Sequence, residues 1–322
     1  MSADQPNVRT AARHPEHLLS IADLGRDDIA DIMATASSFE AIGEREIKKV
    51  PTLRGRTVVN LFYESSTRTR VSFELAAKRL SADVINVSAD ASSVRKGESL
   101  RDTARTLRAL GADAIVLRHP AAGAPAMLAR LTDARVINAG DGAHEHPTQA
   151  LLDIYTVQKH LGRLEGVRVG IVGDIVHSRV ARSNALGFRR IGADVVLIAP
   201  PTLLPLEVNA LGCRWTHDLD AELGELDVVY LLRMQRERHR EPLIPSEHEF
   251  TQGFGLTRER LARLAPGAVV MHPGPMNRGV ELDWEAAESE VALVEAQVSA
   301  GVAVRMALIY MLLGGQPAEV AS

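Results

Sequence analysis

The chain contains the apolar run Val58-Val59-Asn60-Leu61-Phe62-Tyr63, which is soon followed by Ser65-Ser66-Thr67-Arg68-Thr69-Arg70. The first run is typical of a buried strand, and the second opens a helix whose apolar residues are Val71, Phe73, Leu75 and Ala76. Ser66 stands where a helix cap is expected. Helix N-termini attract anions because their first N–H groups lack intrahelical partners. Arg68 adds a planar guanidinium that can bind two phosphate oxygens. We therefore predict a phosphate site here rather than a capped helix with a solvated arginine.

The length and composition limit the classes of protein to which the chain can belong. Its 322 residues suit two domains of ordinary size. A formal net charge of −4 does not indicate a nucleic-acid binder, whose surface must neutralise phosphates. The single cysteine, Cys213, cannot form an internal disulfide, which favours a reducing compartment. We expect Cys213 to be a small, partly buried side chain rather than a catalytic thiol.

No segment of the sequence indicates export or membrane insertion. The N-terminal segment is polar and lacks the apolar core of a signal peptide, so we expect residues 1–16 to form a flexible tail. The most apolar late segment, Met306–Leu313, is too short to span a bilayer. We therefore expect a soluble, cytoplasmic protein that binds neither membranes nor nucleic acid.

Strand-like apolar runs alternate with amphipathic segments along the whole chain. The expected strands form two series, Thr57–Tyr63, Val84–Val87, Ala114–Arg118 and Val136–Asn138, then Val167–Val172, Val195–Ala199, Val228–Leu232 and Ala268–Met271. The expected helices are Asp27–Glu46, Ser99–Leu110, Thr148–Leu161, Ser178–Ile191 and a last one at about Ser289–Leu313. In the last helix, the apolar residues at helical spacing are Val294, Val298, Val302, Met306, Ile309 and Leu313.

This alternation predicts an α/β fold made of two doubly wound, parallel-sheet domains, because continuous apolar strands belong to sheets covered on both faces. We expect the last helix to pack back on the first domain. The predicted domains are residues 17–147 together with 296–316, and residues 148–295. We place the active site in the cleft between them.

Polar residues recur at the predicted carboxyl ends of the strands, where open α/β sheets bind their ligands. In the first series they are Ser66–Thr69, the loop that contains Lys96, Arg118-His119-Pro120 and His146-Pro147-Thr148-Gln149. In the second series they are His177-Ser178-Arg179, Arg233-Met234-Gln235 and His272-Pro273-Gly274-Pro275. Singly, each has an ordinary structural explanation, such as a solvated strand end for Arg118. Their recurrence in both series favours a cleft that binds two anionic substrates.

The same motifs resemble those of the aspartate/ornithine carbamoyltransferase superfamily, and most closely the bacterial type of aspartate carbamoyltransferase catalytic chain. The resemblance runs from about His17 to Leu313. The superfamily motifs stand here as Ser66-Thr67-Arg68-Thr69-Arg70, Arg118-His119-Pro120 and His146-Pro147-Thr148-Gln149. The preference for aspartate rests on Lys96-Gly97-Glu98, His177-Ser178-Arg179 and Arg233-Met234-Gln235. The ornithine enzymes usually carry His-Cys-Leu-Pro where this chain has His272-Pro273-Gly274-Pro275, and a Ser-Met-Gly segment that this sequence lacks.

The resemblance implies transfer of the carbamoyl group from carbamoyl phosphate to L-aspartate, an early step of pyrimidine synthesis, without a metal or organic cofactor. Carbamoyl phosphate would be bound by Ser66, Thr67, Arg68, Thr69, Arg118, His146, Gln149, Gly274 and Pro275. Aspartate would be bound by Lys96, Arg179, Arg233 and Gln235. The catalytic residues would be Arg68, Thr69, Lys96, Arg118 and His146, with Thr69 and His146 donating to the carbonyl oxygen as it gains charge.

The resemblance also implies a cis bond before Pro275 and a homotrimer in which Lys96 serves the neighbouring subunit's site. It further allows association with a regulatory chain or a dihydroorotase.

Four alternative functions differ in how well they fit the sequence. A dehydrogenase is disfavoured because Gly170-Ile171-Val172-Gly173-Asp174 has valine where the dinucleotide motif needs its second glycine. A metal hydrolase is disfavoured because His144, Glu145 and His146 lack the spacing of a zinc-binding helix. A carbamoyltransferase for another amine such as ornithine, and a non-catalytic relative that binds carbamoyl phosphate, stay open as alternatives.

Overall fold

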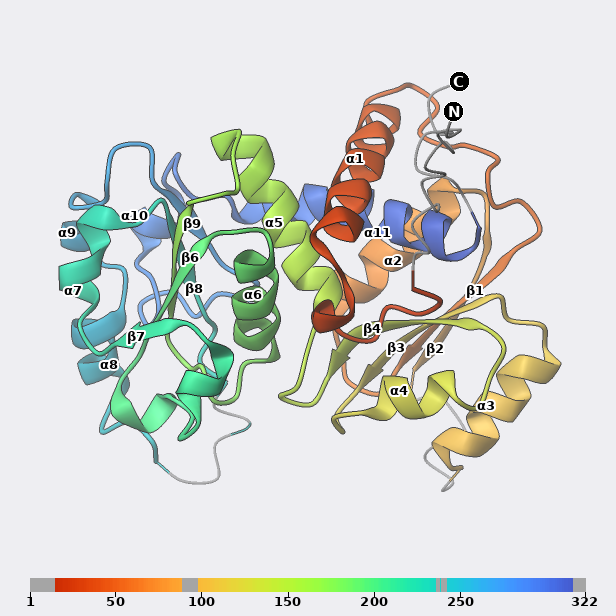
Figure 1. Ribbon diagram of the computed structural model, residues 1–322, viewed down its shortest axis with the longest axis horizontal. Helices are drawn as coiled ribbons and strands as arrows, with labels where there is room; N and C mark the ends of the chain where they lie inside the picture. The colour runs from red at the N-terminus through yellow and green to blue at the C-terminus, as the bar shows by residue number, and fades with distance from the viewer. Residues whose placement is uncertain (1–14, 89–97, 236–237, 239–241, 315–322) are drawn as a thin grey trace, which may run out of the picture.

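Two parallel β-sheets form the centres of two halves of the molecule (Figure 1). The computed structural model describes residues 15–88, 98–235, 238 and 242–314. The first sheet has the order β2-β1-β3-β4 and contains β1 (Thr57–Phe62), β2 (Asp83–Ser88), β3 (Ala114–His119) and β4 (Arg135–Asp141). The second has the order β7-β6-β5-β8-β9 and contains β5 (Arg168–Val172), β6 (Asp194–Ile198), β7 (Arg214–Thr216), β8 (Val228–Leu231) and β9 (Val269–Met271). The predicted fold class is confirmed.

Helices connect the strands and cover both sheets. In the first half they are α1 (Arg26–Gly43), α2 (Thr67–Arg79), α3 (Leu100–Ala109) and α4 (Ala124–Ala129). The chain then passes through α5 (Pro147–Leu161) to α6 (Arg179–Arg190), α7 (Leu219–Glu222), α8 (Glu247–Phe254), α9 (Arg258–Leu261), α10 (Trp284–Ala287) and α11 (Val294–Leu312). Short 3₁₀ turns lie at Ile21–Asp23, Pro201–Leu203, Val208–Leu211 and Leu223–Glu225.

The strands are buried on both faces, which explains their continuous apolar sequences. In β1, Val58 and Phe62 belong to the large core cluster beneath α1, α2 and α11, while Val59 and Leu61 belong to a second cluster with residues of α3 and α4. The second sheet is likewise covered by α6 on one face and by Leu219, Leu256 and Leu282 on the other. Successive residues of one strand therefore serve two different cores.

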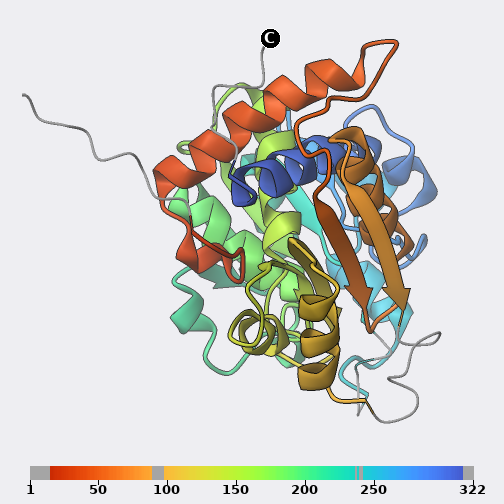
Figure 2. The same ribbon diagram turned by 90° about the vertical axis from the view of Figure 1, so that its right-hand side faces the viewer.

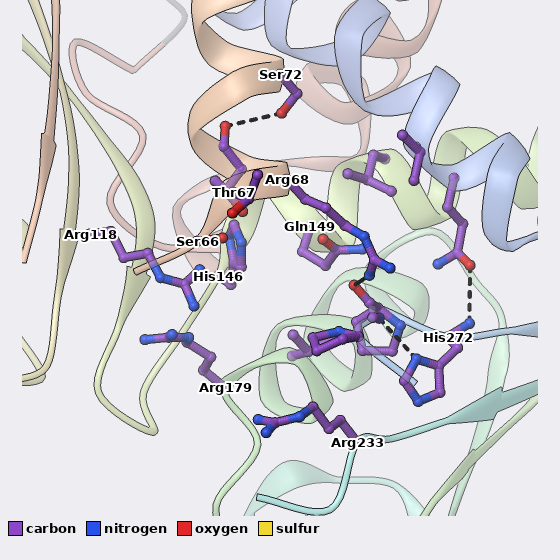
Figure 3. A pocket seen from close by; sticks show the side chains of 18 of the residues that line it. Ser66, Thr67, Arg68, Ser72, Arg118, His146, Gln149, Arg179, Arg233 and His272 are labelled. Carbon is purple, nitrogen blue, oxygen red and sulfur yellow. Dashed lines mark hydrogen bonds between the residues drawn. The ribbon is translucent and has the colours of Figure 1, made fainter. Parts of the chain in front are cut away.

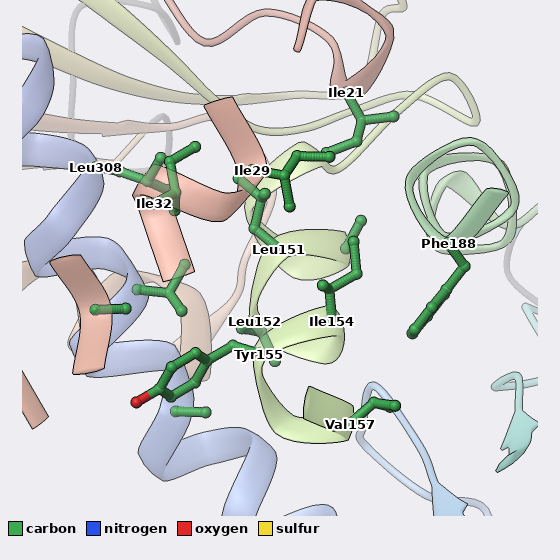
Figure 4. Packing of buried hydrophobic residues seen from close by; sticks show 14 of the residues in the cluster. Ile21, Ile29, Ile32, Leu151, Leu152, Ile154, Tyr155, Val157, Phe188 and Leu308 are labelled. Carbon is green, nitrogen blue, oxygen red and sulfur yellow. The ribbon is translucent and has the colours of Figure 1, made fainter. Parts of the chain in front are cut away.

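The helices α5 and α11 join the two halves. α11 follows the second sheet in the chain but packs against α1, α2 and α5 of the first half (Figures 1 and 2), as the sequence predicts. Apolar side chains of α1, α5, α6 and α11 meet in one cluster (Figure 4), and Phe39 of α1 lies edge-on to Tyr310 of α11. By length and composition α11 could cross a bilayer, but 72% of it is buried in the fold. Its apolar character is that of a core helix.

Several local predictions are wrong. α11 begins at Val294 rather than Ser289, because the preceding residues run beside β9, where the Leu293 N–H donates to the Val270 carbonyl. Val71, Leu75 and Val298 belong to the apolar patterns of α2 and α11 but are exposed in the structure. β7 was missed because its three residues are polar or exposed and lie at the edge of the sheet.

Candidate active site

A cavity of about 850 Å³ lies between the two halves, at the carboxyl ends of both sheets (Figure 3). Predicted site residues that line it from the first half are Ser66, Thr67, Arg68, Thr69, Arg118, His146 and Gln149. Those that line it from the second half are Arg179, Arg233, Gln235, Gly274 and Pro275. Lys96 lies outside the described residues. The predicted site residues Ser66 and Pro275, which are 209 positions apart in the sequence, thus share one cavity.

The N-terminus of α2 opens into the cavity with its backbone donors uncapped. Ser66 occupies the N-cap position, but its side chain makes no capping hydrogen bond, contrary to the expected cap. The first turn carries no acidic residue that would occupy the N–H groups. This arrangement suits a bound anion, because an anion satisfies these donors and the helix dipole together.

Arg68 reaches from α2 to the turn after β9, where its Nη1 donates to the Pro273 carbonyl at 3.3 Å (Figure 3). Gly274 makes this approach possible. Its φ is +65°, and a Cβ at this position would lie 1.1 Å from Arg68 Nη1. The following bond, Gly274–Pro275, is cis, as the resemblance implies.

His146 stands at the N-terminus of α5 and is almost completely buried. Its backbone N–H donates to Ser183 Oγ at 2.8 Å, and its Nδ1 lies 3.4 Å from Thr148 Oγ1. Burial, together with the charges of Arg118, Arg179 and Arg305, lowers the pKa of His146 well below its usual 6.5. The ring is therefore neutral at physiological pH and can donate one hydrogen bond from one ring nitrogen.

The carboxylate of Glu64 lies within 4 Å of three of the arginines in the cavity. Glu64, just after β1, accepts from Arg179 Nη2 at 2.7 Å and lies 3.5 Å from Arg118 Nε and 3.7 Å from Arg238 Nη2. Arg179 also donates to the Gly142 carbonyl at 3.1 Å. Burial chiefly lowers the pKa of Arg118 to about 9, so it stays cationic at neutral pH. Glu64 therefore links charged groups of the two halves.

Glu64, Arg238 and Arg305 also line the cavity, although no sequence motif singled them out. Arg238 donates to the carbonyls of Gly142 and His177 at 3.2 and 2.8 Å. Arg305 is buried within α11, and its guanidinium lies 5.0 Å from the ring centre of Phe73. The signal for Arg305 was a lone arginine inside an otherwise apolar helical run, and the signal for Glu64 was its place at a strand end.

A buried histidine holds the turn that carries Gly274. The Gly274 N–H donates to His272 Nδ1 at 2.9 Å, so the other ring nitrogen carries the proton and lies 3.1 Å from Glu281 Oε1. Burial is the main cause that lowers the pKa of His272, which keeps this ring neutral. The turn thus has a fixed shape beside the cavity.

Comparison with known proteins agrees with this geometry over nearly the whole chain. Residues 16–159 match the family model described as aspartate/ornithine carbamoyltransferase, carbamoyl-P binding domain. Residues 165–312 match the model of the Asp/Orn binding domain. The chain belongs to the aspartate/ornithine carbamoyltransferase family. Within this carbamoyltransferase family, relatives of high sequence identity belong to the aspartate branch.

A catalytic subunit of aspartate carbamoyltransferase from Thermobifida fusca is 59% identical over 93% of this chain and 96% of its own length. The subunit of the same name from Acidothermus cellulolyticus is also 59% identical, over 93% of both chains.

Solved structures from both the aspartate and the ornithine branch of the family resemble this chain. Aspartate transcarbamoylase from Trypanosoma cruzi, in complex with N-(phosphonacetyl)-L-aspartic acid, has a TM-score of 0.83 at 31% identity and covers 91% of this chain and 94% of its own. Ornithine carbamoyltransferase from Pyrococcus furiosus has the same TM-score at 28% identity, over 93% and 97%. The backbone alone therefore does not separate the two substrates. Side chains and sequence identity carry that distinction.

The motifs of the disfavoured classes have structural roles in this carbamoyltransferase fold. A Cβ at Gly170 would lie 2.4 Å from Leu226 Cδ1, so this glycine leaves room for the Leu226 side chain inside the second half. His144 contacts Asp141, whereas Glu145 is buried and accepts from the Ile21 N–H at 2.9 Å. Burial raises the pKa of Cys213 to about 11, which makes its thiol unreactive.

Proposed function

We propose that this chain transfers the carbamoyl group of carbamoyl phosphate to the amino group of L-aspartate and releases phosphate and N-carbamoyl-L-aspartate. The observation that carries the proposal is the charge of the cavity. Six arginines line it, Arg68, Arg118, Arg179, Arg233, Arg238 and Arg305. Among the described lining residues Glu64 is the single acidic one, and it already pairs with arginines. Such a cavity favours two anionic substrates.

The first half is proposed to bind carbamoyl phosphate. The uncapped N-terminus of α2, with Ser66, Thr67 and Thr69, offers donors to the phosphate, and Arg68 offers a bidentate contact. Arg118 is proposed to bridge the phosphate and the carbonyl oxygen. As the amine attacks, this oxygen gains negative charge, and hydrogen bonds from Thr69 and neutral His146 stabilise it most in the transition state.

The carbamoyl nitrogen needs acceptors rather than donors. We propose the Gln149 side-chain oxygen and the Gly274 carbonyl for this purpose, because both residues line the cavity near Arg68. The hydrogen bond from the Gly274 N–H to His272 Nδ1 supports a constant position for the second acceptor.

The second half is proposed to bind L-aspartate. Arg179 and Arg233 are suited to its two carboxylates, with Gln235 in support and Lys96 reaching both ligands from a neighbouring subunit. In the described part of the second half, no acidic residue lines the cavity, so the side-chain ammonium of ornithine has no counter-charge there. Specificity for aspartate follows from this repulsive mismatch. The match to the aspartate carbamoyltransferase catalytic subunits supports the same choice.

The resemblance to the family also supports proposals about the assembly, location, pathway and domain bounds of the enzyme. We infer a cytoplasmic homotrimer that works in pyrimidine synthesis, with residues 17–147 and 296–316 as the carbamoyl phosphate domain and 148–295 as the aspartate domain. Association with a regulatory chain or a dihydroorotase stays a prediction. Mixing an inactive Arg68→Ala chain with an inactive Lys96→Ala chain tests the shared site. Mixed trimers should recover activity, and no recovery despite proven subunit exchange contradicts the sharing of Lys96.

The activity is tested by phosphate release from carbamoyl phosphate with L-aspartate, with L-ornithine and without an amine. Release that depends on aspartate, with carbamoylaspartate formed, is expected. Release with ornithine alone would overturn the assignment of Arg179 and Arg233. If a folded chain binds carbamoyl phosphate but releases no phosphate with either amine, the result would favour a carbamoyltransferase for another amine or a non-catalytic relative.

A further inference from the structure

A buried carboxylate behind the cavity accepts hydrogen bonds from four side chains. Asp153 lies on α5, one turn after Gln149, and has no exposed surface. Its Oδ1 accepts from Gln149 Nε2 at 3.0 Å and from Gln297 Nε2 at 2.7 Å. Its Oδ2 accepts from Asn184 Nδ2 at 3.0 Å and from the Tyr230 hydroxyl at 2.7 Å. The four donors come from α5, α11, α6 and β8, so this carboxylate connects both halves.

An ionised carboxylate only accepts, and this determines how the two amides at Oδ1 are oriented. Both glutamines turn their NH₂ groups toward Asp153, so both carbonyl oxygens face away from it. The Gln297 oxygen accepts the His272 backbone N–H at 3.0 Å (Figure 3). The Gln149 side chain lines the cavity, so its oxygen is the end of the amide that is left for a ligand.

Both proposed acceptors of the carbamoyl NH₂ therefore depend on Asp153. Gln149 depends on it directly. The turn that carries Gly274 depends on it through Gln297 and His272. A flipped Gln149 amide would present a donor to the NH₂ group of the substrate, and two donors repel each other.

We infer that Asp153 is a positioning residue, which holds the Gln149 oxygen toward the cavity and so makes the site prefer a carbamoyl phosphate to an acyl phosphate. This inference rests on the proposed function. Acetyl phosphate is the matched probe, because it replaces the NH₂ group of carbamoyl phosphate with a methyl group and keeps the phosphate and the carbonyl.

The test compares the Ki of acetyl phosphate, as a competitor of carbamoyl phosphate, with the KM of carbamoyl phosphate in the same preparation. The ratio of this Ki to this KM does not depend on the fraction of the chain that is folded. In Asp153→Leu, which keeps the branched shape without an acceptor, the ratio should fall about tenfold, the scale of one neutral hydrogen bond. Asp153→Ser is the second variant in case leucine prevents folding, because the serine hydroxyl is too short to reach the Gln149 amide.

Two variants serve as controls. Asp153→Asn should keep the ratio within about twofold, since its oxygen can still accept from both glutamines while its NH₂ group faces Tyr230 and Asn184. The unpartnered Oδ1 of Asn184 makes this exchange possible after a flip of that amide. Tyr230→Phe removes a donor from Oδ2 only and should also keep the ratio.

The outcomes separate the inference from a merely structural role. Equal weakening of carbamoyl phosphate and acetyl phosphate in the leucine and serine variants would leave the ratio unchanged and overturn the inference. An equal fall of the ratio in Tyr230→Phe would overturn it as well, because Oδ1 would then have no special part. A wild-type chain without carbamoyl transfer to aspartate would refute the proposed function itself, before any variant is compared.

Discussion

Replacing Asp153 by asparagine should stabilise the chain at neutral and alkaline pH. Burial raises the pKa of Asp153 from its ordinary value of 3.8 to about 6, although four hydrogen bonds oppose this rise. Below both values the carboxyl is protonated in the folded and the unfolded chain and has no effect. As the pH rises from about 4 to about 6, the unfolded chain ionises more readily, so stability is lost. The full loss is about 3 kcal/mol for a shift of about two pKa units, and asparagine does not incur it.

The assay is urea unfolding at pH 5 and at pH 8, with the chain concentration fixed because assembly adds to apparent stability. Between these values the wild type should lose about 1.5 kcal/mol of unfolding free energy relative to Asp153→Asn. Asp23→Asn, which removes an exposed carboxylate, separates this effect from the change in net charge. A difference between Asp153→Asn and wild type that is the same at both pH values would refute the reasoning.

Three further substitutions test the cavity. Gly274→Ala should raise the KM for carbamoyl phosphate more than about tenfold, because the added methyl group displaces Arg68. The control Gly279→Ala also replaces a glycine of positive φ but meets open space, so it should only lower stability, by about 1 kcal/mol. Equal KM values for the two variants would refute the displacement of Arg68. His146→Ala should lower kcat by about 10²–10³-fold. The shape of the pH profile of kcat between pH 6.5 and 9 should stay the same, because the wild-type ring is already neutral there. Loss of an ionisation near pH 7 from the profile of the variant would contradict this. Arg68→Lys keeps the charge but loses the planar fork, so the KM for carbamoyl phosphate should rise about tenfold in steady-state assays, and an unchanged KM would argue against a bidentate contact.

The central strands could be predicted because burial on both faces leaves a continuous apolar run in the sequence. The run Val58–Tyr63 matches β1 to within one residue at each end. An edge strand lacks this requirement, and Arg214–Thr216 has no apolar pattern to detect. The start of α11 was misplaced because pairing beside β9 competes with helix formation over residues 289–293, and a single sequence does not reveal that pairing.

Four of the cavity arginines, Arg68, Arg118, Arg179 and Arg233, were found because they stand in short motifs at strand ends. Arg118 ends one predicted strand and Arg233 follows another, and the structure brings both to the same cavity. Glu64 was missed because an acidic residue is unexpected in an anion site, and its purpose is visible only once Arg179 lies 2.7 Å away. Asp153 was missed for a related reason, because its four partners come from distant parts of the chain.

The return of α11 to the first half has a consequence for how the protein is made. The apolar surfaces of α1, α2 and α5 are synthesised before the second sheet, but α11, which covers them, is synthesised after it. Until α11 has been synthesised, Phe39 lacks its packing partner Tyr310, and Phe73 lacks its contact with Arg305. Domains generally fold as units during synthesis, N-terminal first, yet here the first half stays incomplete until the second sheet and α11 have been translated. Nascent chains arrested after α5 should therefore bind chaperones, and expression of that fragment alone should give insoluble protein that a separately supplied α11 peptide rescues.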